Sequence, residues 1–230
     1  MVVQNSADSG LGRFAEWWLT DGLRLQIVRA YEGDVIGSMD GFAALVMLGG
    51  GLLPDEDERG PWLAAERAAA VEALHAGLPT FGICLGAQLL AHVRGGQVQG
   101  RHGTPEFGST ALTRRPESAG DALFDEVPSA FHAIEHHVDA ITALPPDAVL
   151  LASSQACPVQ AFRLGTRAWG VQFHPEVGAD RVAGWAPESV REAGFDADEV
   201  VATARAHEAA SADVCRGIAT RFADLVRSAG

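Results

Sequence analysis

The chain has 230 residues, no lysine, 17 arginines and a formal net charge of −13. Without lysine it has no side-chain amine for Schiff-base catalysis or for a phosphate-binding P-loop, and its negative charge argues against nucleic acids and anionic membranes as partners. Three widely spaced cysteines, together with the lack of a signal peptide or a long apolar stretch, predict a reduced cytoplasmic protein. The length predicts one domain over residues 1–230.

Apolar strands alternate with helices over the first part of the chain. The helix at residues 61–75 is the clearest, because Pro61 suits a first helical turn and Gly77 lies just past the end. The alternation predicts a doubly wound, flavodoxin-like α/β fold, with a mostly parallel sheet and an active site at the carboxyl ends of its strands. Strands are expected at residues 1–4, 23–29, 43–48 and 79–83, and helices at residues 12–20, 61–75 and 85–94.

The second part of the chain has a different pattern. Between residues 97 and 172 strands follow one another without long helices, which predicts antiparallel additions at an edge of the sheet. After Asp180 the pattern is helical, and Gly194 separates a short helix from a long one over residues 197–227. We therefore expect an α/β core over about residues 1–180 and a helical C-terminal extension over about residues 181–230.

Residues 82–86, with the sequence GICLG, carry the strongest chemical signal. A nucleophile between glycines predicts a strand that turns sharply into a helix, because small neighbours are needed where backbone crowds backbone. Cys84 would stand exposed on this turn, near the N-terminus of the helix, where free N–H groups and the helix dipole favour the thiolate. The alternative is a small buried cysteine packed under the strand end.

Residues 168–176, with the sequence AWGVQFHPE, predict a strand that ends in a histidine and a carboxylate. Side chains two residues apart on an extended chain point the same way, so Glu176 can accept a hydrogen bond from one ring nitrogen of His174. The other nitrogen would then face Cys84. These residues supply the nucleophile, base and orienting acid of a catalytic triad, whereas the histidine taken alone would more often lie at a solvated strand end.

The apolar strand at residues 43–48 runs into three glycines. A glycine-rich strand end lets bare backbone N–H groups face a developing negative charge, so the N–H groups of Gly50 and Leu85 are candidates for an oxyanion hole. The alternative is a loose turn. A dinucleotide fingerprint is absent, because no G-x-G-x-x-G follows a strand.

Residues 132–136, HAIEH, formally match the zinc motif H-x-x-E-H, which needs two histidines on one helical face. Nearby prolines and the alternating apolar pattern predict extended chain there instead. We expect no metal and no cofactor.

The elbow GICLGAQ at residues 82–88, the glycine strand end before it and GVQFHPE at residues 170–176 resemble the class I, triad-type glutamine amidotransferases. Nearly the whole chain fits, most closely the stand-alone bacterial members that resemble the amidotransferase half of GMP synthase. The resemblance implies that Cys84 attacks the side-chain amide of glutamine, giving a γ-glutamyl thioester and ammonia, while His174 moves protons and Glu176 holds His174. It also implies a separate synthase that accepts the ammonia.

The resemblance further implies a substrate-binding set, in which Gln88 contacts the bound glutamine. Gly51 stands where the family usually has proline, and Val138 stands where it favours glycine. A freer loop at Gly51 would leave the oxyanion hole less preorganised. If position 138 needs a positive φ, the β-branched Val138 is strained there, so either the loop is rebuilt or the substrate is another γ-glutamyl compound. The implied substrate-binding residues are Gly51, Gln88, His136, His137, Val138 and Asp139.

Three other functions share parts of the pattern. A γ-glutamyl peptidase or hydrolase would use the same triad on a γ-glutamyl amide or peptide. A regulatory subunit would keep the triad residues but serve to bind a synthase. An esterase of the α/β-hydrolase type would share the elbow, but its acid normally precedes its histidine, whereas Glu176 follows His174.

Overall fold

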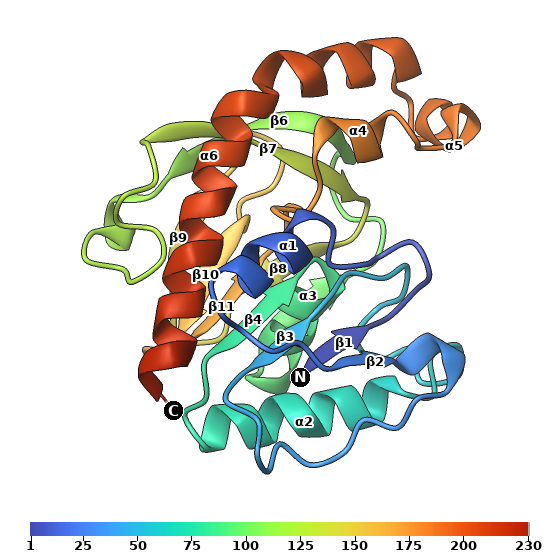
Figure 1. Ribbon diagram of the computed structural model, residues 1–230. Coiled ribbons are helices and arrows are strands. Elements are labelled where there is room, and N and C mark those ends of the chain that lie inside the picture. The colour runs from blue at the N-terminus through green and yellow to red at the C-terminus, as the bar shows by residue number, and fades with distance from the viewer. Residues whose placement is uncertain (230) are drawn as a thin grey trace.

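A nine-stranded sheet runs through the computed structural model, which describes residues 1–229, and helices cover both of its faces (Figure 1). The first five strands in sheet order are parallel and the others pair antiparallel. The parallel part has the strand order of flavodoxin-like sheets, so the predicted fold class is confirmed. The sheet order is β2 (Ile27–Arg29), β1 (Val2–Gln4), β3 (Leu45–Met47), β4 (Thr80–Ile83), β11 (Ala168–Val171), β10 (Ala161–Leu164), β9 (Ala148–Ser153), β6 (Glu106–Arg114) and β7 (Ala130–His137).

Each predicted parallel strand is present but shorter than expected. The largest difference is at residues 23–29, where only β2 pairs, because its neighbour β1 offers a ladder of three residues. The antiparallel additions predicted between residues 97 and 172 are confirmed, and a separate two-stranded sheet joins β5 (Gln97–Gln99) to β8 (Ala140–Ala143).

Most helix boundaries lie close to glycine, proline or capping residues in the sequence. Helix α2 ends just before Gly77, whose φ of 65° suits only a flexible residue, but it begins two residues after Pro61, which lies in the preceding turn. The long helix begins where Asp196 accepts hydrogen bonds from the N–H groups of Asp198 and Glu199, each at 3.0 Å. The helices are α1 (Arg13–Thr20), η1 (Ala30–Glu32), α2 (Leu63–His75), α3 (Leu85–Val93), η2 (Pro116–Ser118), α4 (Ala179–Val182), α5 (Pro187–Glu192) and α6 (Ala197–Ala229).

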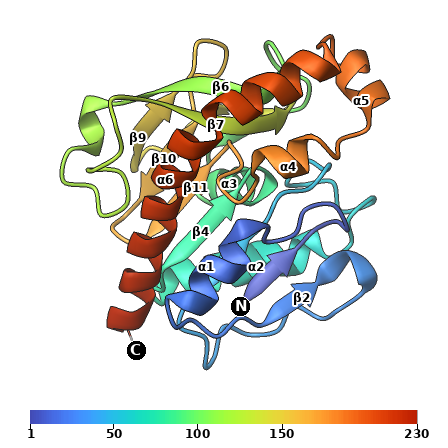
Figure 2. The same cartoon turned by 45° about the horizontal axis from the view of Figure 1, so that its top comes forward.

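Two hydrophobic cores lie on opposite faces of the sheet, because side chains alternate along each strand. On one face Phe81 of β4 meets Phe14 of α1 and Phe222 of α6, with ring centroids 6.2 and 5.4 Å apart. Figures 1 and 2 show α6 crossing this face and lying beside α1. On the other face Leu45 and Met47 of β3 pack against α2 and α3. None of the helices within residues 1–229 has both the length and the apolarity to cross a membrane.

The parallel register brings one end of several strands together. Val3 lies opposite Met47, Met47 opposite Gly82, and Ile83 opposite Val171. The residues that follow these strands therefore meet at the carboxyl edge of the sheet, which is where doubly wound folds bind ligands.

Helix α2 carries an acid in its first turn that the fold buries completely. Glu66 is 0% exposed, and the Asn5 Nδ2 donates a hydrogen bond of 3.1 Å to one of its carboxyl oxygens. Burial raises the pKa of Glu66 from 4.5 to about 8, although the Asn5 hydrogen bond and the Arg67 charge oppose the rise. The folded protein therefore holds a proton on Glu66 that the unfolded chain releases.

This shift predicts a pH dependence of stability that Glu66→Gln removes. The folded state binds the proton more tightly, so its contribution is full below pH 4.5 and is lost as the pH rises towards 8. Wild type should lose about 2–4 kcal/mol relative to the Gln variant between pH 5 and pH 8, measured by urea unfolding. Glu16→Gln, which changes an exposed first-turn glutamate of α1, is the control and should not alter the pH slope. Parallel pH curves for wild type and Glu66→Gln would contradict the prediction.

Candidate active site

Cys84 occupies a sharp turn between β4 and α3. Its φ of 52° and ψ of −107° are unusual for a residue with a side chain. Its N–H donates to the carbonyl oxygen of Val171 at 2.8 Å, and its carbonyl accepts the Gln88 N–H at 3.0 Å, so strand β11 and helix α3 both hold the turn. The expectation that Cys84 stands exposed is wrong. It is 7% exposed, because the loops around it enclose a cavity that it lines.

The two glycines beside Cys84 allow the turn to pack against the sheet. A Cβ on Gly82 would collide with the carbonyl oxygen of Gly86, and a Cβ on Gly86 would collide with that of Met47. Backbone atoms in a strand and a helix cannot move aside easily, so both positions need glycine. The predicted requirement for small residues in the elbow is thereby confirmed.

His174 and Glu176 come together as expected, but not on a strand. Strand β11 ends at Val171, and the histidine lies in a turn closed by the Val177 N–H, which donates to the His174 carbonyl at 3.2 Å. Within this turn His174 Nδ1 and Glu176 Oε1 are 2.8 Å apart. The predicted strand is therefore too long, because its parallel partner β4 ends at Ile83, opposite Val171, and turns away at Cys84.

The protonation of His174 reflects opposing effects. Burial by itself lowers the pKa of this imidazole, but the Glu176 carboxylate and the neighbouring Cys84 thiol outweigh burial and raise the pKa well above its usual value. Nε2 is buried and has no hydrogen-bond partner within residues 1–229. The ring therefore has one nitrogen committed to Glu176 and the other available to chemistry at Cys84.

Segments distant in the sequence hold the turn that carries the histidine. The Arg13 N–H donates to the Glu176 carbonyl at 3.0 Å, and Arg13 Nε donates to the Pro175 carbonyl at 2.8 Å. The preceding Gly12 has a φ of 49° and approaches the Glu176 carbonyl so closely that a side chain would not fit. On the other side the His174 N–H donates to the Ile134 carbonyl of β7 at 2.7 Å. Helix α1 and strand β7 thus position the candidate base.

The glycines after β3 lie against the candidate dyad. A Cβ on Gly49 would lie 3.2 Å from His174 Cε1 and 3.5 Å from Cys84 Cβ, so this glycine sits beside both residues. Gly50 is enclosed by Leu85 and Asn5, whose side chains would lie 2.8 and 3.0 Å from an added Cβ. The structure therefore brings the two predicted oxyanion residues together next to Cys84. The contact of Gly49 with both catalytic candidates was not expected.

Two glutamines link the nucleophile to the sheet. Gln172 Nε2 donates to Cys84 Sγ at 3.4 Å, and Gln88 Nε2 donates to Gln172 Oε1 at 3.2 Å. Both side chains are buried. Sequence reasoning gave a role to Gln88 but missed Gln172, although its place directly after a strand that neighbours the Cys84 strand was a usable signal.

The resemblance implies that residues 136–139 bind the substrate, and hydrogen bonds and the burial of His137 attach this segment to the protein core. His137 is buried, with Nδ1 donating to the Asp139 carbonyl at 3.0 Å, and Asp139 Oδ1 accepts the Arg101 N–H at 2.8 Å. Val138 does not need a positive φ, since Cys84 and Arg101 alone among the described residues with side chains have one. The strain considered for Val138 is therefore absent, and the loop is built differently from one that needs glycine.

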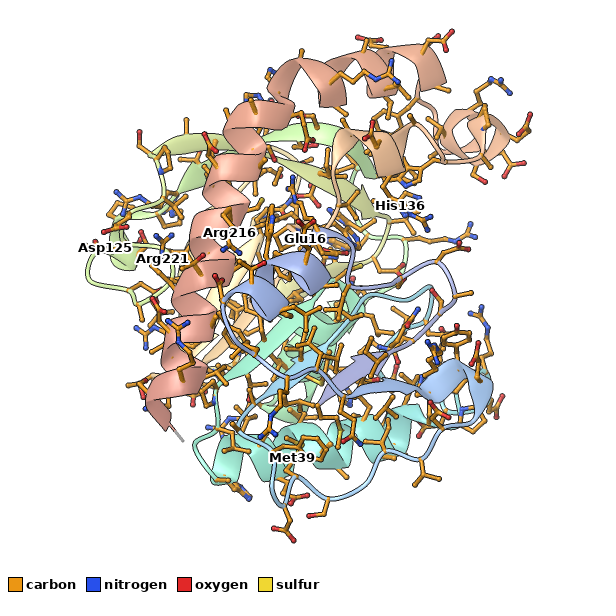
Figure 3. The ribbon with its side chains drawn as sticks, in the orientation of Figure 1. Glu16, Met39, Asp125, His136, Arg216 and Arg221 are labelled. Atoms are coloured by element: carbon orange, nitrogen blue, oxygen red, sulfur yellow. The ribbon has the colours of Figure 1, made fainter. Side chains whose placement is uncertain are left out.

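His136 lies on the opposite side of β7 from His137 and points away from the core. Figure 3 shows it at the end of β7, below α4 and α5. Its ring centroid is 4.5 Å from that of Phe107 and 4.7 Å from that of Trp185. Partial desolvation by these two aromatic rings and the positive charge of nearby His174 lower its pKa, so the ring is neutral at physiological pH.

The candidate nucleophile, base and acid open onto one cavity of about 1260 Å³, together with all the other predicted site residues except Leu85. A nucleophile, a base with an orienting acid and glycine N–H groups in one concave site are the parts needed for acyl transfer. The predicted residues that line the cavity are Gly50, Gly51, Cys84, Gln88, His136, His137, Val138, Asp139, His174 and Glu176.

Comparison with known proteins agrees with this geometry. The family model described as glutamine amidotransferase class-I matches residues 19–182. The chain belongs to the class I glutamine amidotransferase family. It is 38% identical over 156 residues to the glutamine-hydrolysing GMP synthase of Aeropyrum pernix, which covers 68% of this chain and 28% of that protein. The GMP synthase of Streptococcus pneumoniae is 39% identical over 109 residues, or 46% of this chain and 20% of that protein. The chain thus spans less than a third of these curated relatives.

Solved structures show the same fold. A glutamine amidotransferase from Methylobacillus flagellatus superposes with a TM-score of 0.88 at 24% identity, covering 98% of this chain and 94% of that one. A putative GMP synthase subunit from Thermoplasma acidophilum superposes with a TM-score of 0.64 at 28% identity, covering 99% and 92%. The class I amidotransferase fold therefore extends over the described chain.

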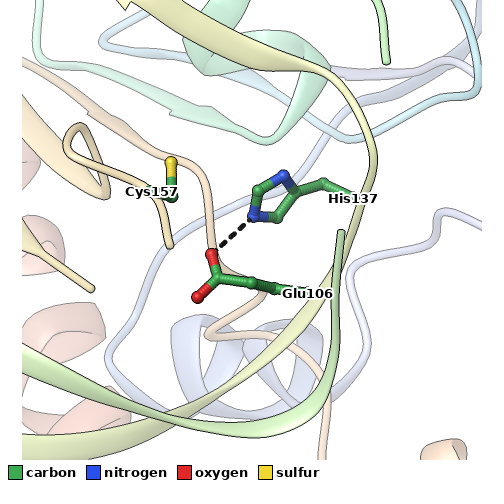
Figure 4. Close-up of side chains that lie close together, drawn as sticks. All are labelled: Glu106, His137 and Cys157. Carbon is green, nitrogen blue, oxygen red and sulfur yellow. Dashed lines mark hydrogen bonds and ion pairs between the residues drawn. The ribbon is translucent and has the colours of Figure 1, made fainter. Parts of the chain in front are cut away.

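Figure 4 shows a buried polar cluster that includes His137 of the loop described above. Glu106, His137 and Cys157 lie close enough together to suggest a metal site. However, burial raises the pKa of the Cys157 thiol to about 12, which keeps it protonated. Glu106 already accepts hydrogen bonds from Ser154 at 2.6 Å and Gln160 at 2.8 Å, and it lies 3.1 Å from His137 Nε2. We interpret the cluster as a hydrogen-bonded support for the loop.

Residues 132–136 lie on β7, so their histidines do not form a helical zinc motif.

The packing of the elbow predicts different outcomes at two nearby glycines. Gly86→Ala should destabilise the protein by about 1–3 kcal/mol, because the new methyl group has no room beside the Met47 carbonyl. Gly51→Ala is the matched control, since an added Cβ there meets nothing within 4 Å, and its stability should change by less than about 0.5 kcal/mol. Chemical denaturation measures both, and equal stabilities for the two variants would contradict the packing described for the elbow.

Proposed function

We propose that this chain is a glutaminase subunit that hydrolyses the side-chain amide of glutamine and delivers ammonia to a separate synthase. The observation that carries the proposal is the arrangement of His174, bonded to Glu176 at 2.8 Å through one nitrogen while the other is free in the cavity that Cys84 lines. This is the relation of base, orienting acid and nucleophile that covalent acyl transfer needs.

In the proposed reaction the Cys84 thiolate attacks the amide carbon of glutamine. The N–H groups of Gly50 and Leu85 stabilise the oxygen as it becomes negative, and protonated His174 gives its proton to the departing nitrogen, which leaves as ammonia. The γ-glutamyl thioester is then attacked by water, from which neutral His174 takes a proton. The thiolate departs, glutamate is released, and the raised pKa of His174 suits both roles.

Two observations support an ammonia-accepting partner. The chain has no lysine and so no P-loop lysine with which to activate an acceptor by ATP. The curated relatives named GMP synthase are much longer than this chain, which fits an amidotransferase part that works with a synthase part.

A strongly negative chain with three unpaired cysteines also suits the reducing cytoplasm.

A second candidate is hydrolysis of larger γ-glutamyl compounds by the same triad. The cavity of about 1260 Å³ exceeds the roughly 300–1,000 Å³ usual for small ligands. The side chains of Phe107 and Trp185, together with neutral His136, line part of it and offer apolar surface that glutamine alone does not need. A γ-glutamyl amide with an apolar substituent would use that surface.

One experiment separates the two candidates. The purified protein is incubated with glutamine, a γ-glutamyl dipeptide and γ-glutamyl anilide, and the release of glutamate, ammonia or aniline is followed. A glutaminase releases glutamate and ammonia from glutamine at a rate that exceeds its turnover of the anilide. A higher kcat/KM for the anilide would favour the second candidate. No release from any substrate would contradict both candidates.

The triad roles predict an order of activity among variants. Cys84→Ala should abolish turnover, because it removes the atom that forms the thioester. Glu176→Gln should retain about ten to a hundred times more activity than His174→Ala, because the orienting acid is usually the least costly member to lose. Steady-state ammonia release measures the order. Wild-type turnover in both His174→Ala and Glu176→Gln would remove these residues from the mechanism.

A further inference from the structure

Asn5 follows β1 directly and lies beside the glycines that follow β3. Its position is set by the parallel register, in which Val3 pairs with Met47, so the next residues of the two strands run side by side. Asn5 is 4% exposed. It is therefore a buried polar residue at the carboxyl edge of the sheet, outside the set of catalytic and substrate-binding candidates.

Each polar atom of the Asn5 side chain has a partner. Its Nδ2 donates to the Leu48 carbonyl at 3.0 Å and to Glu66 Oε1 at 3.1 Å, and its Oδ1 accepts from Trp62 Nε1 at 2.8 Å. An amide with both donors and its acceptor occupied cannot rotate without breaking a buried hydrogen bond. Glu66 of α2 and Trp62, the residue before this helix, thus fix the orientation of the Asn5 side chain. Asn5 in turn holds the carbonyl group of Leu48, the residue that follows β3.

The glycine strand end meets Asn5 in two places. The Leu48 carbonyl, which Asn5 bonds, belongs to the peptide that joins Leu48 to Gly49. The Asn5 Cβ forms one wall of the narrow space around Gly50, and the Leu85 side chain forms the other. Glycines have no side chain to restrict their dihedral angles, so the orientation of these peptides has to be set by their neighbours.

We propose that Asn5 and Glu66 are positioning residues that hold the Gly49–Gly50 backbone in the orientation needed for the oxyanion hole. Glu66 lies entirely inside the protein and its second oxygen has no partner within the described chain, which is an unfavourable environment for an acid. The hydrogen bond to Asn5 gives the buried acid a role in the reaction. This inference rests on the proposed function, in which the Gly50 N–H faces the oxyanion.

The test compares a reaction that forms an oxyanion with one that does not. Glutamine hydrolysis passes through a tetrahedral oxyanion, whereas alkylation of Cys84 by iodoacetamide is a direct displacement of iodide by sulfur and needs no oxyanion hole. Both rates are measured for wild type, Asn5→Ala, Glu66→Leu and Glu66→Gln. Thr80→Val is the matched control, since it also removes a buried polar group but at the amino end of β4.

Asn5→Ala should lower kcat by about 10- to 1,000-fold, the range up to complete loss of one oxyanion donor, with KM within threefold and the alkylation rate unchanged. Glu66→Leu should lower kcat less, because the bond from Asn5 to Leu48 remains. Glu66→Gln should restore kcat, because its amide oxygen can accept from Asn5. Thr80→Val should keep both rates.

Hydrogen–deuterium exchange of residues 48–50 provides a measurement that does not depend on turnover. Faster exchange there in folded Asn5→Ala, with the rest of the sheet unchanged, supports the proposal even if the chain proves inactive on glutamine. The proposal is overturned if exchange at residues 48–50 is unchanged. It is also overturned if kcat stays within twofold of wild type in both Asn5→Ala and Glu66→Leu, or if kcat and alkylation fall together. A wild type that is alkylated but hydrolyses no γ-glutamyl substrate contradicts only the proposed function.

Discussion

The close approach of α3 to the sheet is the constraint on which the candidate site depends. Gly86 at the start of this helix packs on the Met47 carbonyl, and Gly82 of β4 packs on the Gly86 carbonyl. The chain can make this contact only by turning through a positive φ at Cys84, where a residue with a side chain is under strain. The strain places the thiol at the end of the sheet, beside the glycines of the neighbouring strand. The geometry of the nucleophile is therefore a consequence of backbone packing.

The candidate base depends on a different set of contacts, made over long distances in the sequence. Arg13 holds the turn through backbone groups of Pro175 and Glu176 and forms an ion pair of 3.1 Å with Glu208 of α6. Glu208 also accepts the Ala179 N–H at 2.8 Å, at the start of α4. Arg13 and Glu208 both lie outside residues 19–182, the segment that matches the family model. The ends of the chain thus contribute to the support of a site whose reactive groups lie within the family segment.

Electrostatics around the cavity follows from burial. Burial raises the pKa of the carboxyl groups of Glu66 and Glu135, and it would lower that of His174 if Glu176 and Cys84 did not counteract it. Buried acids without full hydrogen bonding weaken a fold, because their charged forms are poorly solvated. Glu66 is hydrogen-bonded to Asn5, and Glu135 lies 3.5 Å from His137. These two buried acids lower the stability of the fold near the candidate site, and their contacts there hold side chains of the site region in place.

The sequence by itself determined the elements whose cause is local. Alternation of apolar strands with helices predicted the parallel sheet, and glycines around Cys84 predicted the elbow, because backbone crowding leaves no other residue type there. Spacing also predicted the pairing of His174 with Glu176. The tertiary structure decided what depends on distant chain: the short β2, the early end of β11, the enclosure of Cys84 and the role of Gln172. It likewise brought Asn5 and Glu66 to the glycine strand end, because a contact between residues 61 positions apart arises from sheet register and helix packing and leaves no local pattern in the sequence.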